Sequence, residues 1–453
     1  MFDALQVPIP ALESKANSTS STVRQAYVFA LDPTTEQADF LRSHIGGSRF
    51  CYNALLSLVK ANWDDNLARK NAGIDVSPEE WFGTSHFNLR SLWAEHRDEL
   101  APWWGANGWS TYNDASQRLS RAFTNWRQGR AKFPVFKTKG PGGSVRFANT
   151  AVRLADSHHV VVSRIGEIKT YESTRKLYRH LERSTGRILA ATVSERCGRW
   201  SISFDVDVER NIPAMRLPVR IIGIDVGLST LYTGATPEGE PILTVPNPRH
   251  FVSSQHRLAV AKRVESRRQG PRNGVAPSNR WQRAHSRVQK IHSEIANSRR
   301  NLIHQTTTHL AKQFDVIVIE DLNIAGMLKN HSLAKHISDA SWGEFFRQLQ
   351  YKTQWYGSAL VIVDRFYPST KTCARCGTVK AKLPLSMREF ACDMCGHRIN
   401  RDLNAATNLA RMGMAGTRSV IGRGGEVRPE QRIRDARAHP DEALTEALTS
   451  VSA

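Results

Sequence analysis

The sequence predicts a multidomain α/β protein, on the strength of its length, its apolar runs and a change of pattern along the chain. With 453 residues, 40% of them hydrophobic, the chain is long enough for about three domains with their own cores. Long helical stretches, one opened by a capping-box pattern at Ser341 and Glu344, separate the apolar runs, as in an α/β layer fold. Three continuous apolar runs are typical of central strands covered on both faces: residues 217–227, 314–323 and 359–366.

The N-terminal half begins with residues 1–22, whose polar and unpatterned sequence predicts disorder. Residues 36–130 follow as a predicted helical region, whose first stretch we expect to be two helices broken at Gly46 and Gly47. Aromatic core packing accounts for the tryptophans of this region better than stacking on bases does. Seven of the eleven tryptophans lie there: Trp63, Trp81, Trp93, Trp103, Trp104, Trp109 and Trp126.

The helical region interrupts a β-rich module that residues 23–35 and 131–215 are expected to build. Apolar alternation on both sides of Cys197 and Gly198 predicts a hairpin over 188–208. The helical region is thus expected to be an insertion into this module.

The charge of the chain predicts a polyanionic partner. Lys and Arg number 63 against 42 Asp and Glu, which gives a net charge of +21. No apolar run approaches the roughly 20 residues of a spanning helix, and the N-terminus lacks the basic start and apolar core of a signal peptide. We therefore expect a soluble, cytoplasmic protein that binds nucleic acid and not membrane.

Residues 249–300 are the most cationic stretch, with thirteen Lys and Arg and only two acids, Glu265 and Glu294. Exposure of a helix face to solvent does not explain such an excess of positive charge, because like charges repel unless a polyanion neutralises them. The candidate phosphate-binding residues include two beside the cysteines described below: Arg263, Arg267, Arg268, Arg280, Arg283, Arg287, Lys371 and Arg375.

Three acidic residues stand where α/β folds place their sites. Asp225 and Glu320 each end a predicted core strand, and Asp402 begins a predicted helix. Such a set of oxygen ligands suits Mg²⁺, and two Mg²⁺ ions about 4 Å apart can activate a water and stabilise the leaving oxygen of a phosphodiester. Asp321 and Asp364 are expected to have structural or supporting roles.

Four cysteines have the spacing C-x2-C-x15-C-x2-C of a tetrahedral zinc site: Cys373, Cys376, Cys392 and Cys395. Because sulfur fills all four positions, one structural Zn²⁺ with no open coordination position is predicted. Lys371 and Arg375 lie where they could contact backbone phosphates beside it. The other two cysteines, Cys51 and Cys197, are expected to be buried apolar residues.

These motifs together resemble the TnpB family of transposon-encoded RNA-guided DNA endonucleases, which is similar to compact type V CRISPR effectors. The resemblance rests on "GIDVGLSTLYTG", "VIVIEDLNIAGMLKNHSLAKHISDASWGEFFRQLQYK", the four-cysteine ribbon and "NRDLNAATNLA", with "YVFALDPTTEQADFLRSHIGGSRFCYNALL" and "FPVFKTKGPGGSVRF" upstream. It covers most of residues 27–412.

The resemblance implies a RuvC-like (RNase H-like) nuclease domain with an inserted zinc ribbon, preceded by a wedge-like β-barrel and a helical recognition lobe. The family's three catalytic acids fall on Asp225, Glu320 and Asp402, and many relatives carry an acid at the position of Asn400. The expected segments are a disordered N-terminus 1–22, the barrel 23–35 and 131–215, the recognition lobe 36–130, the nuclease domain 216–369 and 397–412, the ribbon 370–396 and a disordered tail 413–453.

The function implied is Mg²⁺-dependent, RNA-guided cleavage of DNA by a single acidic site in the cytoplasm of a prokaryote, at the nucleoid. Guide RNA pairs with one strand of the target DNA, the protein recognises a short adjacent motif, and the basic stretch 249–300 lines the path of the strand to be cut. Two alternatives remain. A guided repressor without cleavage would not need the three intact acids, and an unguided nuclease or transposase-associated protein would not need the large N-terminal half. The sequence leaves open whether the guide comes from a transposon end or a CRISPR array, and whether the protein is a monomer or a homodimer.

Overall fold

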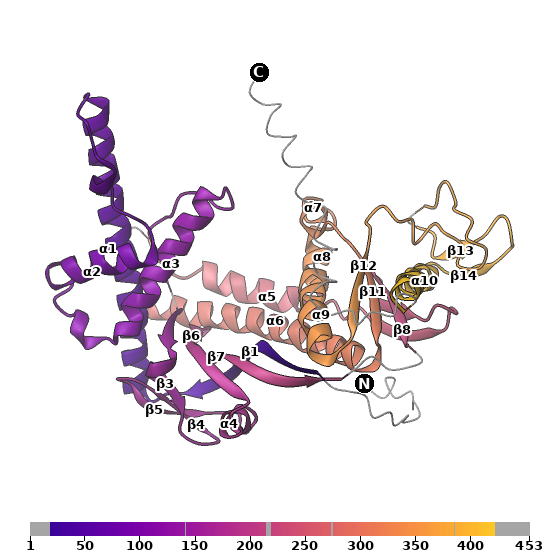
Figure 1. Ribbon diagram of the computed structural model, residues 1–453, viewed down its shortest axis with the longest axis horizontal. Helices are drawn as coiled ribbons and strands as arrows, with labels where there is room; N and C mark the ends of the chain where they lie inside the picture. Colours follow the sequence, from indigo (N-terminus) through magenta and orange to yellow (C-terminus); the bar gives the residue numbers. More distant parts are fainter. Residues whose placement is uncertain (1–18, 141, 214–218, 273–274, 385, 422–453) are drawn as a thin grey trace. The chain divides into compact units, whose positions relative to one another are not determined.

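The computed structural model describes residues 19–140, 142–213, 219–272, 275–384 and 386–421 and is drawn in Figure 1. The chain divides into two compact units, Thr22–Arg210 and Asn211–Ala453, the second together with Met1–Ser21. We call them the N-terminal and the C-terminal unit and describe each by itself. The finer segment boundaries expected from the sequence stay predictions.

A seven-stranded sheet in the order β2-β6-β7-β1-β5-β4-β3 forms the base of the N-terminal unit. Its edge strands β2 and β3 contribute Val145, Phe147 and Val152 to one apolar cluster with the central strands, so the sheet curls into a nearly closed barrel around that core. The elements are β1 (Thr19–Asp32), β2 (Gly143–Ala148), η4 (Asn149–Ala151), β3 (Val152–Leu154), β4 (His159–Val162), β5 (Gly166–Thr170), α4 (Arg175–Glu182), β6 (Gly186–Arg196) and β7 (Arg199–Ile212).

Strands β6 and β7 form the predicted hairpin, and its turn corrects the expectation for one cysteine. Cys197 and Gly198 both have positive φ angles, 54° and 71°, as a two-residue turn between twisted strands requires. Cys197 is therefore a partly exposed turn residue and not a buried apolar one, whereas Cys51 is fully buried as expected. The strand β1 also begins at Thr19, so residues 19–22 are strand and not disordered; residues 1–18 lie outside the described part.

The helical region contains α1 (Thr35–Asn71), which runs without a break through Gly46 and Gly47, so the expected pair of helices is wrong. A Cβ atom at Gly47 would lie 2.9 Å from the Asn107 amide nitrogen, which shows that this glycine allows close packing against the neighbouring segment. Packing of this kind outweighs the roughly 1 kcal/mol that glycine costs inside a helix. The remaining elements are η2 (Pro78–Glu80), α2 (His86–Leu100), η3 (Trp104–Ala106) and α3 (Trp109–Arg127).

Most tryptophans of this region belong to its core, as expected from the sequence. Trp93 is buried and stacks on Tyr112 at a centroid distance of 5.0 Å. Three more pack partly buried against the same cluster: Trp63, Trp104 and Trp126. Trp103 and Trp109 remain exposed.

The C-terminal unit is built on a five-stranded sheet in the order β10-β9-β8-β11-β12. The strands β8, β11 and β12 are parallel, which confirms the three predicted core strands, and β9 and β10 are antiparallel additions. The bounds are β8 (Ile221–Val226), β9 (Thr230–Ala235), β10 (Pro241–Pro246), β11 (Val316–Glu320) and β12 (Ala359–Val363).

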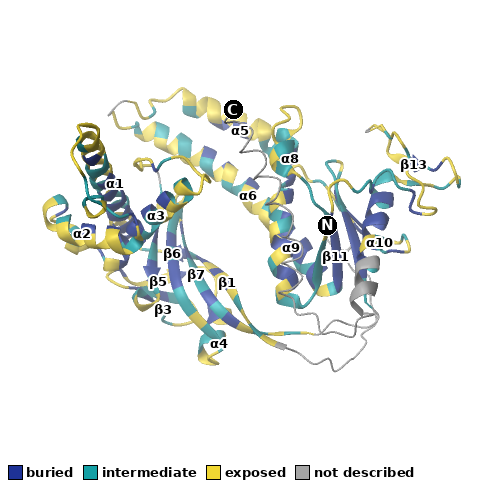
Figure 2. Ribbon diagram, turned by 45° about the horizontal axis from the view of Figure 1, so that its top comes forward, coloured by how far each residue is buried: buried dark blue, intermediate teal, exposed yellow. Residues whose placement is uncertain are grey.

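Helices cover both faces of this sheet. In Figure 2, α9 and α10 flank β11, and their buried residues are dark blue. Ile317 and Ile319 pack in the cluster that contains α6 and α9, whereas Val316 and Val318 pack against Leu409 and its neighbours on α10. The helices are α5 (His250–Ser266), α6 (Asn279–Gln313), α7 (Ile324–Met327), α8 (Ala334–Ala340), α9 (Trp342–Tyr356) and α10 (Arg401–Ile421), and the short strands β13 (Glu389–Ala391) and β14 (Arg398–Asn400) pair with each other.

Two expectations for this unit are wrong. Ser341 does not form a capping box, because it joins α8 directly to α9 and has a left-handed φ of 56°, while Glu344 pairs with Arg347. Residues 413–421, expected to be disordered, continue α10, since Gly413 packs closely on Val318 of the sheet. The rest of the predicted tail, 422–453, lies outside the described residues. Among the described residues, no helix is long and apolar enough to cross a membrane.

Candidate active site and metal centre

Asp225 and Glu320 lie side by side at the carboxyl edge of the sheet. Strands β8 and β11 are parallel with Ile224 opposite Ile319, so the next residue of each strand falls at the same edge. Side chains of a strand alternate between its faces. Asp225 therefore lies on the same face of the sheet as Ile221, and Glu320 lies on the same face as Val318. Ile221 and Val318 both pack against α10, so both acids are on the face that α10 covers.

Asp402 reaches the same edge because it stands in the first turn of α10, which packs directly on β8. A Cβ atom on Gly227, just past the end of β8, would lie 4.0 Å from an Asp402 carboxylate oxygen. The side chain of Asn400 accepts hydrogen bonds from the amides of Asp402 and Leu403, at 2.9 and 3.1 Å, and so caps the helix. Asn400 thus has a capping role in this chain.

The electrostatics of the edge favour a cation. Burial raises the pKa of Asp225 well above its usual range, and the negative charges of Glu320 and Asp402 raise it further, while Arg401 lowers it. Burial also raises the pKa of Glu320, and this effect exceeds the opposite effect of a hydrogen bond from Ser369. Because carboxylates of like charge destabilise one another's ionised form, a divalent cation would relieve the repulsion.

The spacing of the three carboxylates bears on how they would hold a metal. Among the described residues, two groups have ligand atoms that all lie within 4.8 Å of one another, the four cysteines and the trio Asp156, His159 and Glu167. The three acids are therefore set more widely than a single dehydrated ion would require. Mg²⁺ keeps several waters and binds through one or two carboxylates, and a pair of ions spreads its ligands further. The donor set of three carboxylates fits hydrated Mg²⁺.

The neighbouring acids have the supporting roles that the sequence suggested. Asp321 forms an ion pair with Arg365, and Asp364 accepts the amide of Phe366 at 2.8 Å in the turn that follows β12. Both interactions hold the loop that leaves the sheet beside Glu320, since Glu320 lies opposite Val363 in the β11–β12 register.

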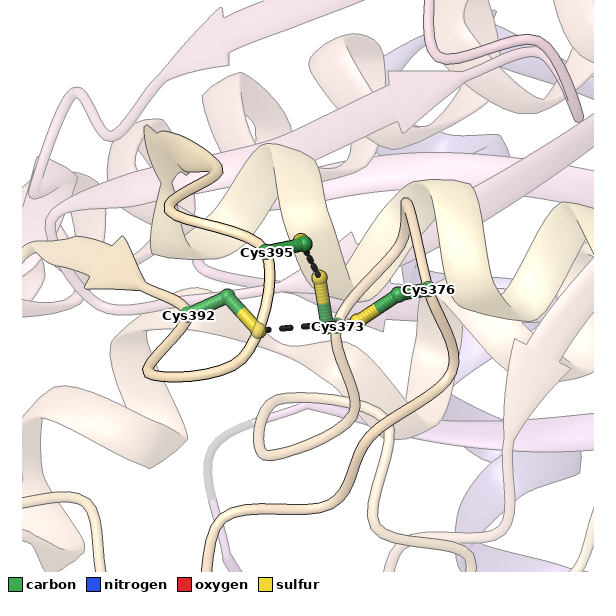
Figure 3. Close-up of side chains that lie close together, drawn as sticks. All are labelled: Cys373, Cys376, Cys392 and Cys395. Atoms are coloured by element: carbon green, nitrogen blue, oxygen red, sulfur yellow. Dashed lines mark hydrogen bonds between the residues drawn. The ribbon is translucent and has the colours of Figure 1, made fainter.

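The four cysteines lie together as the predicted zinc site requires. Their sulfur atoms point toward one another in Figure 3, with 3.7 Å between Cys373 and Cys395 and 3.5 Å between Cys376 and Cys392. Tetrahedral zinc with Zn–S bonds of about 2.3 Å places its sulfurs about 3.8 Å apart, so the residues fit the ion. Hydrogen bonds with Thr378 lower the pKa of Cys376 to about 6, whereas burial and hydrogen bonds with the other three sulfurs raise the pKa of Cys395 to about 12.

The predicted phosphate-binding arginines lie on a helical hairpin. Helices α5 and α6 pack through Leu258 and Ala261 against Val288, Ile291 and Ile295. Six arginines of the hairpin are exposed, and none of them forms an ion pair within the described part of the chain: Arg263, Arg267, Arg268, Arg280, Arg283 and Arg287. Arg375 is exposed on the ribbon, and Lys371 is partly exposed. Their contact with nucleic acid stays a prediction.

Sequence reasoning missed the polar residues that hold these acids in place. Ser369 donates a hydrogen bond to Glu320, and Asn404 and Asn408 of α10 bind the backbone of Thr372. One sequence signal could have indicated them. Asn400, Asn404 and Asn408 recur every four residues along one helix face, although asparagine is a poor helix former.

The chain is similar along most of its length to curated proteins named "Putative RNA-guided DNA endonuclease". The protein from Streptomyces pristinaespiralis is 32% identical over 412 residues, which cover 90% of this chain and 93% of that one. The protein from Mycobacterium tuberculosis strain H37Rv is 34% identical, covering 85% of this chain and 86% of that one, and InsQ of Escherichia coli K12 is 30% identical, covering 86% and 92%. This chain belongs to the TnpB family.

Three family descriptions match separate parts of this TnpB chain. Residues 21–67 match a "Helix-turn-helix domain", residues 202–331 a "Probable transposase" and residues 342–409 a "Cas12f1-like, TNB domain". The last range contains all four cysteines. The expected family is thereby confirmed.

The fold of this TnpB protein has a solved counterpart. The structure described as "Cryo-EM structure of the Cas12f1-sgRNA-target DNA complex" superposes with a TM-score of 0.50 at 11% identity, covering 86% of this chain and 99% of that one. At so low an identity the likeness concerns the fold alone.

Proposed function

We propose that this TnpB protein is an RNA-guided, Mg²⁺-dependent DNA endonuclease with a single RuvC-like acidic site. The observation that carries the proposal is the meeting of Asp225, Glu320 and Asp402 at one sheet edge from three distant parts of the chain. The names of the relatives and the positive charge of the chain support the same substrate class.

In this proposal guide RNA and target DNA are the partners, and base pairing between them supplies sequence specificity while the protein holds the heteroduplex by its backbone. A short DNA motif beside the target is recognised before pairing. The substrate places the activity in the bacterial cytoplasm, at the chromosome. The exposed arginines of the α5–α6 hairpin bind phosphates along the path of the strand to be cut.

We assign roles to the site residues on the basis of their places in the fold. Asp225, Glu320 and Asp402 would hold two Mg²⁺ ions, which supply a nucleophilic water at neutral pH and stabilise the leaving oxygen of the phosphodiester. Asn400 fixes the start of α10 and hence the position of Asp402. The zinc centre, closed by four sulfurs, takes no part in the chemistry and holds the ribbon folded.

The test compares two adjacent carboxylates. Glu320→Gln removes a proposed ligand, whereas Asp321→Asn removes only one partner of a surface ion pair with Arg365, which is worth about 0–1 kcal/mol. The purified complex with a guide of defined sequence is given matched target DNA and Mg²⁺. We expect Glu320→Gln to bind the target but not to cut it, and Asp321→Asn to cut at nearly the wild-type rate.

Each alternative function predicts a different result from the same experiment. Equal loss in both variants would contradict the assigned site. Cleavage by the wild type that is independent of the guide would indicate an unguided nuclease, and guided binding without any cleavage by the wild type would indicate a repressor.

A further inference from the structure

The segment that leaves β12 and leads into the zinc ribbon passes directly over Glu320. Ser369 of this segment is only 3% exposed, and its hydroxyl donates a hydrogen bond to Oε1 of Glu320. Its own amide donates to the Tyr367 carbonyl at 2.8 Å, and its carbonyl accepts from the side chain of Asn408 at 2.8 Å. The main chain is thus held without the hydroxyl, which is left for the carboxylate.

The helix that carries Asp402 holds the same segment. Asn408 and Asn404 each donate to the carbonyl of Thr372 at 2.7 Å, and Asn404 also accepts the amide of Ala374 at 2.9 Å. Both asparagines are buried. The residue between these two contacts is Cys373, the first zinc ligand, so a continuous set of hydrogen bonds joins the zinc centre to Glu320.

We propose that Ser369 is a positioning residue, which orients the Glu320 carboxylate for the divalent ion and couples that carboxylate to the fold of the zinc ribbon. The inference rests on the proposed function, because it takes Glu320 to be a metal ligand. A single donor on Oε1 selects one orientation of the carboxylate and leaves Oε2 and the remaining lone pairs for the cation. Partners of this kind around a metal ligand fix its orientation and raise the affinity for the metal.

The competing explanation is that Ser369 only completes a local turn. Thr372 in the same segment offers a matched control for this explanation. Its hydroxyl donates to the Pro368 carbonyl at 2.8 Å and, within the described residues, forms no hydrogen bond with a carboxylate. If local hydroxyls merely stabilise the segment, removal of either one should have the same effect.

The experiment measures Mn²⁺ binding to the full-length protein by isothermal titration calorimetry, with zinc content from atomic absorption on the same samples. Four variants are compared with the wild type: Ser369→Ala, Ser369→Thr, Thr372→Val and Glu320→Gln. We expect Ser369→Ala to bind Mn²⁺ about 10- to 100-fold more weakly with its zinc retained. Ser369→Thr, which keeps the hydroxyl, should restore the affinity, and Thr372→Val should match the wild type.

The outcomes separate this inference from the function on which it rests. Wild-type affinity in Ser369→Ala, or equal weakening in Thr372→Val, would overturn the positioning role. Wild-type affinity in Glu320→Gln would instead overturn the acidic site itself. If Ser369→Ala does not fold, Ser369→Cys keeps the shape of the side chain with only a weak S–H donor, and undiminished Mn²⁺ affinity in that variant would equally refute the inference.

Discussion

Gly223 lies in the middle of β8, where helix α10 packs directly on the strand. Its replacement by alanine should disturb the site through the backbone of α10. A Cβ atom at this position would lie 2.1 Å from the Ala406 carbonyl oxygen, 2.3 Å from the Ala410 nitrogen and 2.9 Å from the Ala410 Cα. All three are backbone atoms of a regular helix, so no side-chain rotation can relieve the contact. The helix and the strand must therefore separate.

The size of that separation follows from the distances. Real Cβ atoms essentially never approach heavy atoms closer than 3.0 Å, so α10 must move by roughly 1 Å away from β8. Overpacking of a core in this way typically costs about 1–3 kcal/mol. Asp402 stands one turn before Ala406 on the same helix and would be displaced with it. Misplacement of a reacting group by 1 Å can reduce the rate about 10²-fold.

Two measurements test the reasoning. Single-turnover cleavage of matched DNA by the guided complex should slow about 10²-fold in Gly223→Ala, and amide hydrogen exchange should accelerate in the peptides of α10. The control is Gly46→Ala, because no heavy atom lies within 4 Å of a Cβ at this mid-helix glycine and the added methyl group should stabilise α1 by about 0.5–1 kcal/mol. Wild-type cleavage together with unchanged exchange in Gly223→Ala would refute the close contact between β8 and α10.

Three further predictions follow from the site and the core. Asp225→Ala should abolish cleavage and leave guided DNA binding intact, as an electrophoretic mobility assay beside the cleavage assay would show; residual cutting would contradict its role as a ligand. Cys373→Ser should lower the zinc content below one per chain, whereas Cys197→Ser in the hairpin turn should not, and full zinc in the first variant would argue against the four-sulfur centre. Burial lowers the pKa of Lys352 from 10.5 to about 8, so the unfolded chain holds a proton that the folded chain releases between these values. Stability to urea should then rise from pH 8 to 10.5 relative to Lys352→Met, and parallel pH profiles for the two proteins would rule this out.

The parts of the site that could be predicted from sequence are those that a local pattern determines. Continuous apolar runs indicated the strands β8 and β11, and the rule that sites lie at the carboxyl ends of parallel strands then placed Asp225 and Glu320 together. The four-cysteine spacing indicated zinc for the same reason, since a tetrahedral centre requires two short C-x2-C turns. In both cases the prediction rests on short local patterns: an apolar run that ends in an acid, and a pair of cysteines separated by two residues.

The parts that could not be predicted depend on contacts between distant residues. Ser369 contacts Glu320 across 49 positions of sequence, and Asn408 contacts the Thr372 carbonyl across 36; the spacing of the asparagines marks a helix face but does not identify the partner. Local rules also failed where tertiary packing overrode them. Gly47 does not break α1 because Asn107 packs against it, and Ser341 does not cap α9 because α8 ends at the same residue.

The position of the ribbon between β12 and α10 follows from what those two elements carry. On the way in, the chain passes Glu320 and binds it through Ser369; on the way out, Asn400 of β14 caps the helix that begins with Asp402. Both ends of the insertion are therefore fixed beside a proposed metal ligand, and the four cysteine sulfurs come from both sides of the ribbon. A zinc ion on these sulfurs would hold the two ends in a constant relation, and it would support the acidic site without touching it, because it would maintain the backbone from which Glu320 and Asp402 are held.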